Sequence, residues 1–380
     1  MKKLIYWKNL IIFIATVVII LCLLYVKAAN DQQNTSVNQI STISSNKSQN
    51  DIKLTTPKVK SLPTDKFASY IGVKSEQITA DFGQPALVLP RANNVEWWVY
   101  DLDSDRYLKI GIDRYSKRVC DIFNVGKSKF QGSLRVGLSL KKLFKLTTFY
   151  ANFQFSYHEQ SFQYELSEEA LNTHPLISFK NGSYVIVYLK PGSKEIYALE
   201  YLNTDMLLKK NLYRLVTQVP IPVQYQGKVD WDNLSTGLPT DFLQQINTKR
   251  TMQAQPTLEL NSEKQVQAEQ LLKKITKQTA AAVPKRYVKS LKKILGDEFS
   301  NQHSVFLDKD NLKKAALAAA SVDSKSQVFV ISPLYNASSI FERPHLLRKL
   351  IKKLIETDSQ QIGMAYSHGV LVIVVGRSEN

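Results

Sequence analysis

YIGVKSEQITADFGQP, residues 70–85, opens a unit that occurs twice in this chain of 380 residues. Ile78 and Phe82 stand at helical spacing, and Gly83 with Pro85 is a typical helix stop. Runs rich in aromatic and β-branched residues follow, separated by turn residues, at 96–100, 107–112 and 119–125. We therefore expect a short helix that packs against a small antiparallel sheet.

VGLSLKKLFKL, residues 136–146, opens the second copy, with Gly137 in the place of Gly72. Strands are expected at 183–189 and 195–202, and Ser193–Ile196 corresponds to the turn Ser116–Val119 of the first copy. The copies are 65 residues apart at the glycines and 77 apart at the turns, which predicts a longer loop in the second copy. That loop is expected at about 154–175.

EWWVYDLDSDRYLKIGI, residues 96–112, contains an aspartate series that is compatible with a calcium loop or a hairpin turn: Asp101, Asp103 and Asp105. A calcium loop of the EF-hand type needs Gly after the third aspartate and Glu at its twelfth position. Arg106 and Ile112 occupy these places. Because strands are predicted on both sides, we interpret the series as a polar hairpin turn.

An uncharged apolar run from Leu10 to Val26 is close to the roughly 17 to 25 residues that cross a bilayer as a helix. The lysines that precede it favour a cytoplasmic N-terminus and an extracellular remainder: Lys2, Lys3 and Lys8. We expect a cytoplasmic tail at 1–8 and a retained signal-anchor, a single transmembrane helix, at 9–27. The alternative is a signal peptide cleaved near Ala28, which would release a secreted protein.

Residues 28–65 are rich in Asn, Gln, Ser and Thr and contain no aromatic residue. Such a composition cannot bury enough apolar surface to fold, so we expect a disordered stalk. Cys22 lies in the apolar run, and Cys120 therefore has no cysteine partner beyond the membrane. No disulfide is expected in the extracellular part.

The order of IGV, FGQP, EWWVY, YLKIGI and the second opening VGLS resembles the CAP-associated N-terminal domain of bacterial surface proteins. That domain commonly precedes a CAP domain, the SCP-like fold of cysteine-rich secretory, antigen-five and pathogenesis-related proteins. Ile246, Asn247 and Arg250 are similar to a motif in the opening helix of that second domain. Residues 360–376 resemble its closing hairpin.

The resemblance implies an α+β protein of a Gram-positive cell surface. It places a CAP-associated domain at 66–217, as two helix-plus-sheet repeats of about 66–130 and 131–217. A linker is then expected at 218–238, and a degenerate CAP-like α/β/α sandwich at 239–376.

CAP domains that bind metal use two histidines and two glutamates, a set suited to a divalent ion. The resemblance puts His303 and His345 at the histidine positions, whereas apolar residues of the segment 327–331 replace a carboxylate. We therefore predict ordinary histidines, no metal, no cofactor and a non-enzymatic role. The alternative is a CAP-type hydrolase or peptidase that uses His303 and His345.

Two segments place cations opposite an apolar helical stripe. Residues 283–296 carry Lys285, Lys289, Lys292 and Lys293. Residues 345–355 carry Arg348, Lys349, Lys352 and Lys353. Two interpretations stay open: the cations only solvate core-facing helices, or they bind an anionic surface.

The net charge is +17, and the C-terminal part is the most basic. For an extracellular chain the anionic partners are a cell-wall polymer or lipid headgroups rather than nucleic acid. We expect a binding or scaffolding role in the envelope. A further option is an envelope protein that contacts an aromatic face of the first repeat, formed by Trp97, Trp98, Tyr100 and Tyr107.

Overall fold

The computed structural model describes residues 59–92, 94–103, 105–126, 132–216, 231–296, 304–356 and 358–376. The predicted cytoplasmic tail, the predicted anchor at 9–27 and most of the predicted stalk lie outside these residues. Among the helices of the described ranges, none combines the length and the apolar character that a membrane crossing requires.

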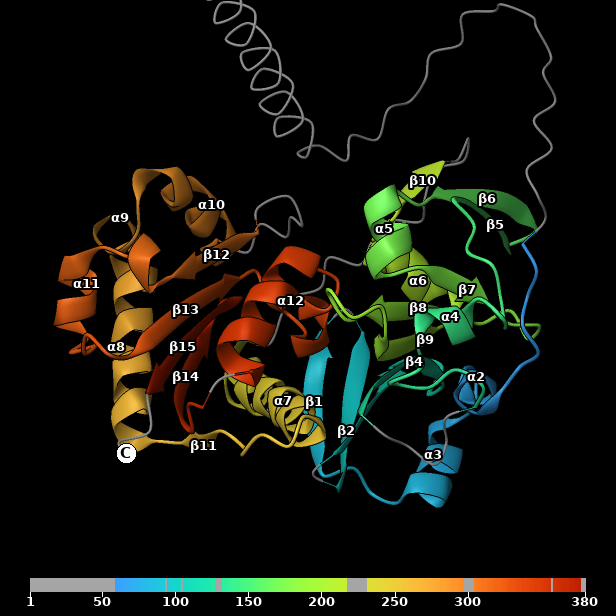
Figure 1. Cartoon of the computed structure of the whole chain (residues 1–380), viewed down its shortest axis with the longest axis horizontal. Coiled ribbons are helices and arrows are strands. Elements are labelled where there is room, and N and C mark those ends of the chain that lie inside the picture. Colours follow the sequence, from blue (N-terminus) through green and yellow to red (C-terminus); the bar gives the residue numbers. More distant parts are fainter. Residues whose placement is uncertain are drawn as a thin grey trace, which may run out of the picture. The chain divides into compact units, whose positions relative to one another are not determined.

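The first copy of the repeat contains two short helices and four strands (Figure 1). They are α2 (Lys66–Tyr70), α3 (Ser75–Phe82), β1 (Leu87–Ala92), β2 (Val95–Asp103), β3 (Arg106–Asp113) and β4 (Val119–Gly126). β2 and β3 pair antiparallel around the aspartate series, which confirms the predicted hairpin. The three predicted strands are also confirmed, while β1 is an additional one.

The aromatic residues of β2 and β3 mostly point into the interior. Trp97, Tyr100 and Tyr107 are buried, and Trp98 is half-buried with its Nε1 donating to Glu96 Oε1 at 2.8 Å. The interpretation of these rings as an exposed contact face is therefore wrong, because they fill the core on both sides of the sheet.

The second copy carries more structure than the sequence indicates. Its elements are α4 (Leu140–Leu143), β5 (Asn152–Tyr157), β6 (Gln160–Glu165), α5 (Glu168–Thr173), β7 (Leu176–Ser178), β8 (Tyr184–Leu189), β9 (Ile196–Leu202), α6 (Thr204–Lys210) and β10 (Arg214–Val216). The predicted loop at about 154–175 is thus wrong: it contains a hairpin and a helix. Buried residues alternate along β5 and β6, and these strands form a three-stranded sheet with β10.

One seven-stranded sheet unites the two copies, in the order β1-β2-β3-β4-β9-β8-β7. The copies join where β4 and β9 pair antiparallel, with Phe123 opposite Glu200. Cys120 on β4 is buried and forms no disulfide, and its Sγ donates to Gly111 O at 3.4 Å.

The two copies share the same backbone frame. Gly72 and Gly137 have φ of 86° and 83°. The amide of Gly72 donates to Val119 O at 2.8 Å, and the amide of Gly137 donates to Ile196 O at 2.8 Å. Each glycine therefore fastens the start of its copy to the strand after the equivalent turn.

The C-terminal module is a three-layer α/β/α arrangement (Figure 1). Its sheet has the order β11-β14-β15-β13-β12. The strands are β11 (Glu259–Leu260), β12 (Val305–Asp308), β13 (Gln327–Ser332), β14 (Gln361–Ser367) and β15 (Val370–Gly376). The helices are α7 (Trp231–Met252), α8 (Ser262–Lys277), α9 (Thr279–Ala282), α10 (Lys285–Leu295), α11 (Lys314–Ala319) and α12 (Pro344–Leu350), with the 3₁₀ turns η2 (Lys309–Asn311) and η3 (Ala337–Ile340) and the π-helical turn η4 (Ile351–Ile355).

Alternation along the strands divides the side chains between two cores. Val370, Val372 and Val374 pack with α8 and α10, whereas Leu371, Ile373 and Val375 pack with α7 and α12. The predicted closing hairpin at 360–376 is confirmed as β14 and β15. α7 begins at Trp231, inside the segment 218–238 that is predicted as a linker.

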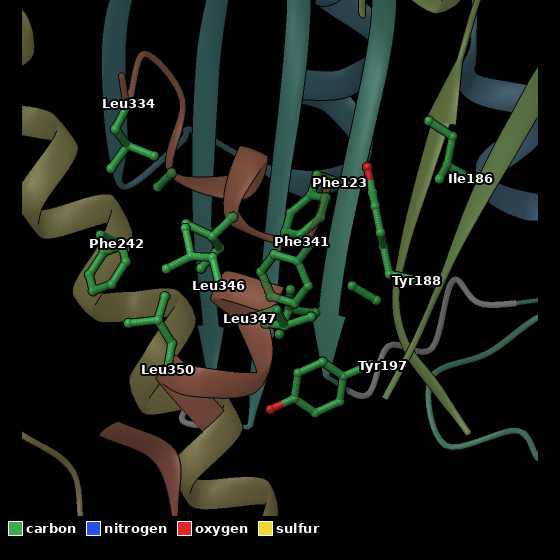
Figure 2. Close-up of a cluster of buried hydrophobic side chains, with 14 of the residues drawn as sticks. Phe123, Ile186, Tyr188, Tyr197, Phe242, Leu334, Phe341, Leu346, Leu347 and Leu350 are labelled. Atoms are coloured by element: carbon green, nitrogen blue, oxygen red, sulfur yellow. The ribbon is translucent and has the colours of Figure 1, made fainter. Parts of the chain in front are cut away.

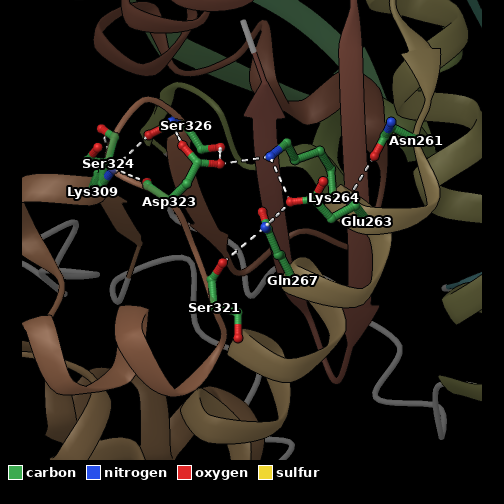
Figure 3. Close-up of polar contacts among 9 residues, drawn as sticks. All are labelled: Asn261, Glu263, Lys264, Gln267, Lys309, Ser321, Asp323, Ser324 and Ser326. Carbon is green, nitrogen blue, oxygen red and sulfur yellow. Dashed lines mark hydrogen bonds and ion pairs between the residues drawn. The ribbon is translucent and has the colours of Figure 1, made fainter.

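A polar cluster fastens α8 to the segment before β13 (Figure 3). Lys264 Nζ lies 2.8 Å from Asp323 Oδ2, and Gln267 Nε2 donates to Ser321 O at 3.0 Å. Lys309 donates to three backbone oxygens, those of Asp323, Ser324 and Ser326. These cations are satisfied within the fold and are therefore structural.

The largest core crosses from the duplicated half into the C-terminal module (Figure 2). The Phe341 ring, just after η3, lies 5.2 Å from that of Phe123 and 5.9 Å from those of Tyr188 and Tyr197, measured between centroids. One face of the seven-stranded sheet is thus covered by the other module.

Candidate functional site

The basic face of α10 borders a groove. Leu291 and Ile294 are buried against the core, as the apolar stripe predicts. Beside this stripe Lys285, Val288, Lys289, Lys292 and Lys293 line a shallow depression that is mostly open to solvent, called the α10 groove. The structure therefore brings together the four cations that the sequence analysis names on this helix.

Helix stability does not account for all of these charges. Lys292 and Lys293 stand in the last turn, where the helix dipole favours cations. Lys285 stands in the first turn, which has no acidic residue, and there the dipole disfavours a cation. Lys285, Lys289 and Lys292 form no ion pair with the rest of the described chain. An anion in the groove would relieve their mutual repulsion.

The second predicted cationic face lies on α12 and η4. Leu347, Leu350, Ile351 and Leu354 are buried, and Arg348, Lys349, Lys352 and Lys353 are exposed. Lys349 Nζ lies 4.9 Å from the ring centroid of Phe306 on β12. None of these four cations lines the α10 groove.

The histidines do not form a site in the described residues. His345 opens α12 with its side chain 85% exposed, and its Nε2 lies 3.5 Å from Glu169 Oε1. His303 lies outside the described residues, so the predicted roles of this pair stay predictions. The described ranges contain no group of three His, Cys, Asp or Glu that could hold a metal ion. Residues 328–331 are buried in β13.

The motif residues of α7 have structural roles. Ile246 is buried, and Asn247 exchanges two hydrogen bonds with the backbone of Leu258, at 3.0 and 2.8 Å. The buried guanidinium of Arg250 donates to the carbonyl oxygens of Pro256, Leu354 and Ser359 at 2.6, 2.6 and 2.8 Å. Arg250 thus fastens α7 to the end of η4 and to the segment before β14.

Buried charges lie where the two modules meet. Lys109 on β3 forms an ion pair with Asp241 on α7, and it donates to Asn336 Oδ1 at 2.8 Å. Tyr107 donates to the same aspartate, and Gln245 donates to it at 3.1 Å. The partners come from both modules, so the charges are compensated only when the modules are docked.

A second buried group surrounds Glu200 on β9. Its carboxylate accepts from Tyr188 Oη at 2.6 Å and lies 3.0 Å from Lys210 Nζ, which also pairs with Glu342. Burial alone would lower the pKa of Lys210, but the two glutamates raise it above its usual value. Burial and the nearby Glu200 raise the pKa of Asp121 well above its usual range. Asp121 and Glu200 are buried from solvent, so this group joins the modules rather than meeting a substrate.

Sequence reasoning missed these buried charges. Lys109, Asp121 and Glu200 each interrupt an apolar strand run. A charged residue in a strand whose remaining residues are mostly apolar indicates that the charge is buried and has a partner. Asp241 on α7, the partner of Lys109, is 132 residues away in the sequence, a distance that the pattern alone does not reveal.

Residues 71–213 match the family model described as CAP-associated N-terminal. The duplicated half of the chain is thus similar to a CAP-associated N-terminal domain. A membrane protein of Bacillus subtilis (strain 168), named uncharacterized membrane protein YlbC, is 26% identical over 155 residues, 41% of this chain and 44% of that relative. The match therefore spans less than half of the relative's length.

Two crystal structures share the fold. An extracellular protein containing an SCP domain from Bacillus anthracis has a TM-score of 0.63 and 17% identity, covering 88% of this chain and 100% of that chain. A cysteine-rich secretory protein from Staphylococcus aureus has a TM-score of 0.63 and 16% identity, covering 84% and 95%. The chain thus shares the fold of a protein that contains an SCP domain.

Proposed function

We propose that this chain is a cell-surface protein of a Gram-positive envelope, and that it binds an anionic cell-wall polymer through the α10 groove without catalysing a reaction. The extracellular and membrane assignments of the similar proteins support the location. The lysines that line the groove carry the binding proposal, because Lys285 and Lys289 stand where helix stability does not require them.

A sedimentation assay with isolated wall fragments tests the binding. The full chain in detergent is mixed with fragments before and after removal of their phosphate-containing polymer. We expect co-sedimentation only with the untreated fragments, and we expect it to fall as salt rises from about 0.05 M to about 1 M, because screening then acts over a few ångströms.

The triple variant Lys285→Gln, Lys289→Gln and Lys292→Gln should lower the affinity roughly fivefold or more, because each cation near an anionic surface contributes up to about 1 kcal/mol. The matched control Lys349→Gln, Lys352→Gln and Lys353→Gln removes the same charge from α12 and η4. An equal loss in both variants would contradict a groove-specific site. Binding that is insensitive to salt would contradict the proposal altogether.

A further inference from the structure

The second copy of the repeat exposes an apolar and basic surface at α4. Phe144 is 54% exposed and Leu146 is 38% exposed, and Lys141, Lys142 and Lys145 around them are also exposed. These five residues are called the α4 patch. The three lysines form no ion pair with other described residues.

The first copy shows that the fold does not require this surface. The two copies share the frame set by Gly72 and Gly137, and the amides of Ser75 and Leu140 donate to Lys117 O and Lys194 O at 2.9 and 2.8 Å. In this register Ile78 and Leu143 correspond, and both are fully buried.

The positions that match the α4 patch hold different residues in the first copy: Glu76, Gln77, Thr79, Ala80 and Asp81. An acidic and polar surface in one copy is thus an apolar and basic surface in the other, although α3 continues to Phe82 whereas α4 ends at Leu143. The exposed apolar residues are therefore specific to the second copy.

The chain enters the fold beside the α4 patch. The amide of Lys60 donates to Tyr150 Oη at 3.2 Å, and Leu62 bridges to Phe179. Tyr150 follows Leu146 by four residues, so their Cα atoms lie at most about 14 Å apart. The predicted anchor ends at residue 27, and the predicted stalk leads from there to this entry point. The α4 patch thus lies beside the residues at which the predicted stalk joins the fold.

We propose that the α4 patch rests on the anionic bilayer surface, with Phe144 and Leu146 among the lipid headgroups and the three lysines at the phosphates. An interfacial contact of this kind combines an exposed aromatic or aliphatic group with surrounding lysines. A wall polymer offers charge but no apolar region to cover Phe144. The α4 patch thus makes a second contact, and its partner differs from that of the α10 groove.

A cleavable tether tests this contact on the whole protein. A protease site is introduced into the predicted stalk, within residues 40–46, and the full chain is reconstituted into vesicles of phosphatidylglycerol and phosphatidylcholine. After cleavage, the fraction of the released part that sediments with the vesicles is measured. We expect retention at low salt, and release both at high salt and from vesicles of phosphatidylcholine alone.

The decisive variant gives the patch the residues of the first copy: Lys141→Glu, Phe144→Thr and Leu146→Asp. We expect it to lower the vesicle partition coefficient roughly tenfold or more. Phe144→Ser alone should give a smaller loss, and it removes a ring that is 54% exposed and otherwise packs against Phe149. Unchanged near-ultraviolet circular dichroism would show that both variants keep the native packing.

The triple α10 variant serves as the control and should retain vesicle binding. Immediate release of the unmodified protein, or retention that the α4 variants leave intact, would overturn the proposal. Loss of retention in the α10 variant alone would also overturn it, and would assign lipid binding to the groove instead.

Discussion

At the residue scale, Arg250 explains why its motif occurs at the start of the second module. The resemblance located Arg250, but the sequence did not show that its guanidinium binds three backbone oxygens. The planar fork of arginine can reach several acceptors at once, whereas lysine presents a single point charge. The motif is therefore a structural fastening, and it carries no evidence of catalysis.

Arg250→Lys should destabilise the protein by about 3 kcal/mol, because buried carbonyl groups lose charged hydrogen-bond donors. Denaturant unfolding measures the change. Arg286→Lys is the matched control, since Arg286 is exposed and donates to a single side chain, Asn311, at 3.0 Å. Equal stability of the two variants would show that the three hydrogen bonds of Arg250 are dispensable.

His174 should make stability depend on pH. Burial lowers the pKa of His174 to about 4, with Glu342 acting in the opposite direction. Between that value and the unfolded pKa of about 6.5, the unfolded state binds a proton that the native state does not. Stability is therefore lost as pH falls through this window, by about 3 kcal/mol, and the full penalty is present below it.

Unfolding free energies measured at several pH values test whether stability falls as the pH falls. His174→Gln should flatten the dependence between about pH 4 and pH 6.5. His158→Gln is the control, because His158 is exposed. A variant at position 174 with the slope of the unmodified protein would refute the assignment.

At the scale of elements, the matched glycines of the two copies allow a paired test. Gly72 and Gly137 have similar positive φ values, and a side chain at either position would meet no atom within 4 Å. Gly72→Ala and Gly137→Ala should therefore cost similar amounts, about 1 kcal/mol or more each, from backbone strain alone. Thermal unfolding of the two variants measures this, and clearly unequal losses would argue against a common frame.

The strands were predictable where the two copies agree, because alternating apolar residues and turn residues recur at matching places. β5 and β6 were missed although Phe153 and Phe155 alternate with polar residues. The segment is an insertion relative to the first copy, and an insertion predicts a loop when no matching strand guides the assignment. The cationic face of α10 was predictable from helical spacing, but the groove beside it depends on tertiary packing.

At the scale of the whole folded part, the shared core predicts that the modules unfold together. Phe341 packs on Phe123, Tyr188 and Tyr197 across the interface. Phe341→Ala should cost about 3 to 5 kcal/mol and lower hydrogen-exchange protection in both β9 and β14. Phe306→Ala, at a half-buried position on β12, should cost less. Protection lost in a single module would contradict a joint unfolding unit.

The buried ion pairs between the modules also determine where this protein can safely be shortened. A fragment that stops at 217–230 would turn Lys109, Glu200 and a row of aromatic rings from an interior into an outer surface. Such a fragment would aggregate and precipitate. A fragment that begins just before residue 59 keeps both modules together and is better suited to crystallisation or antibody production.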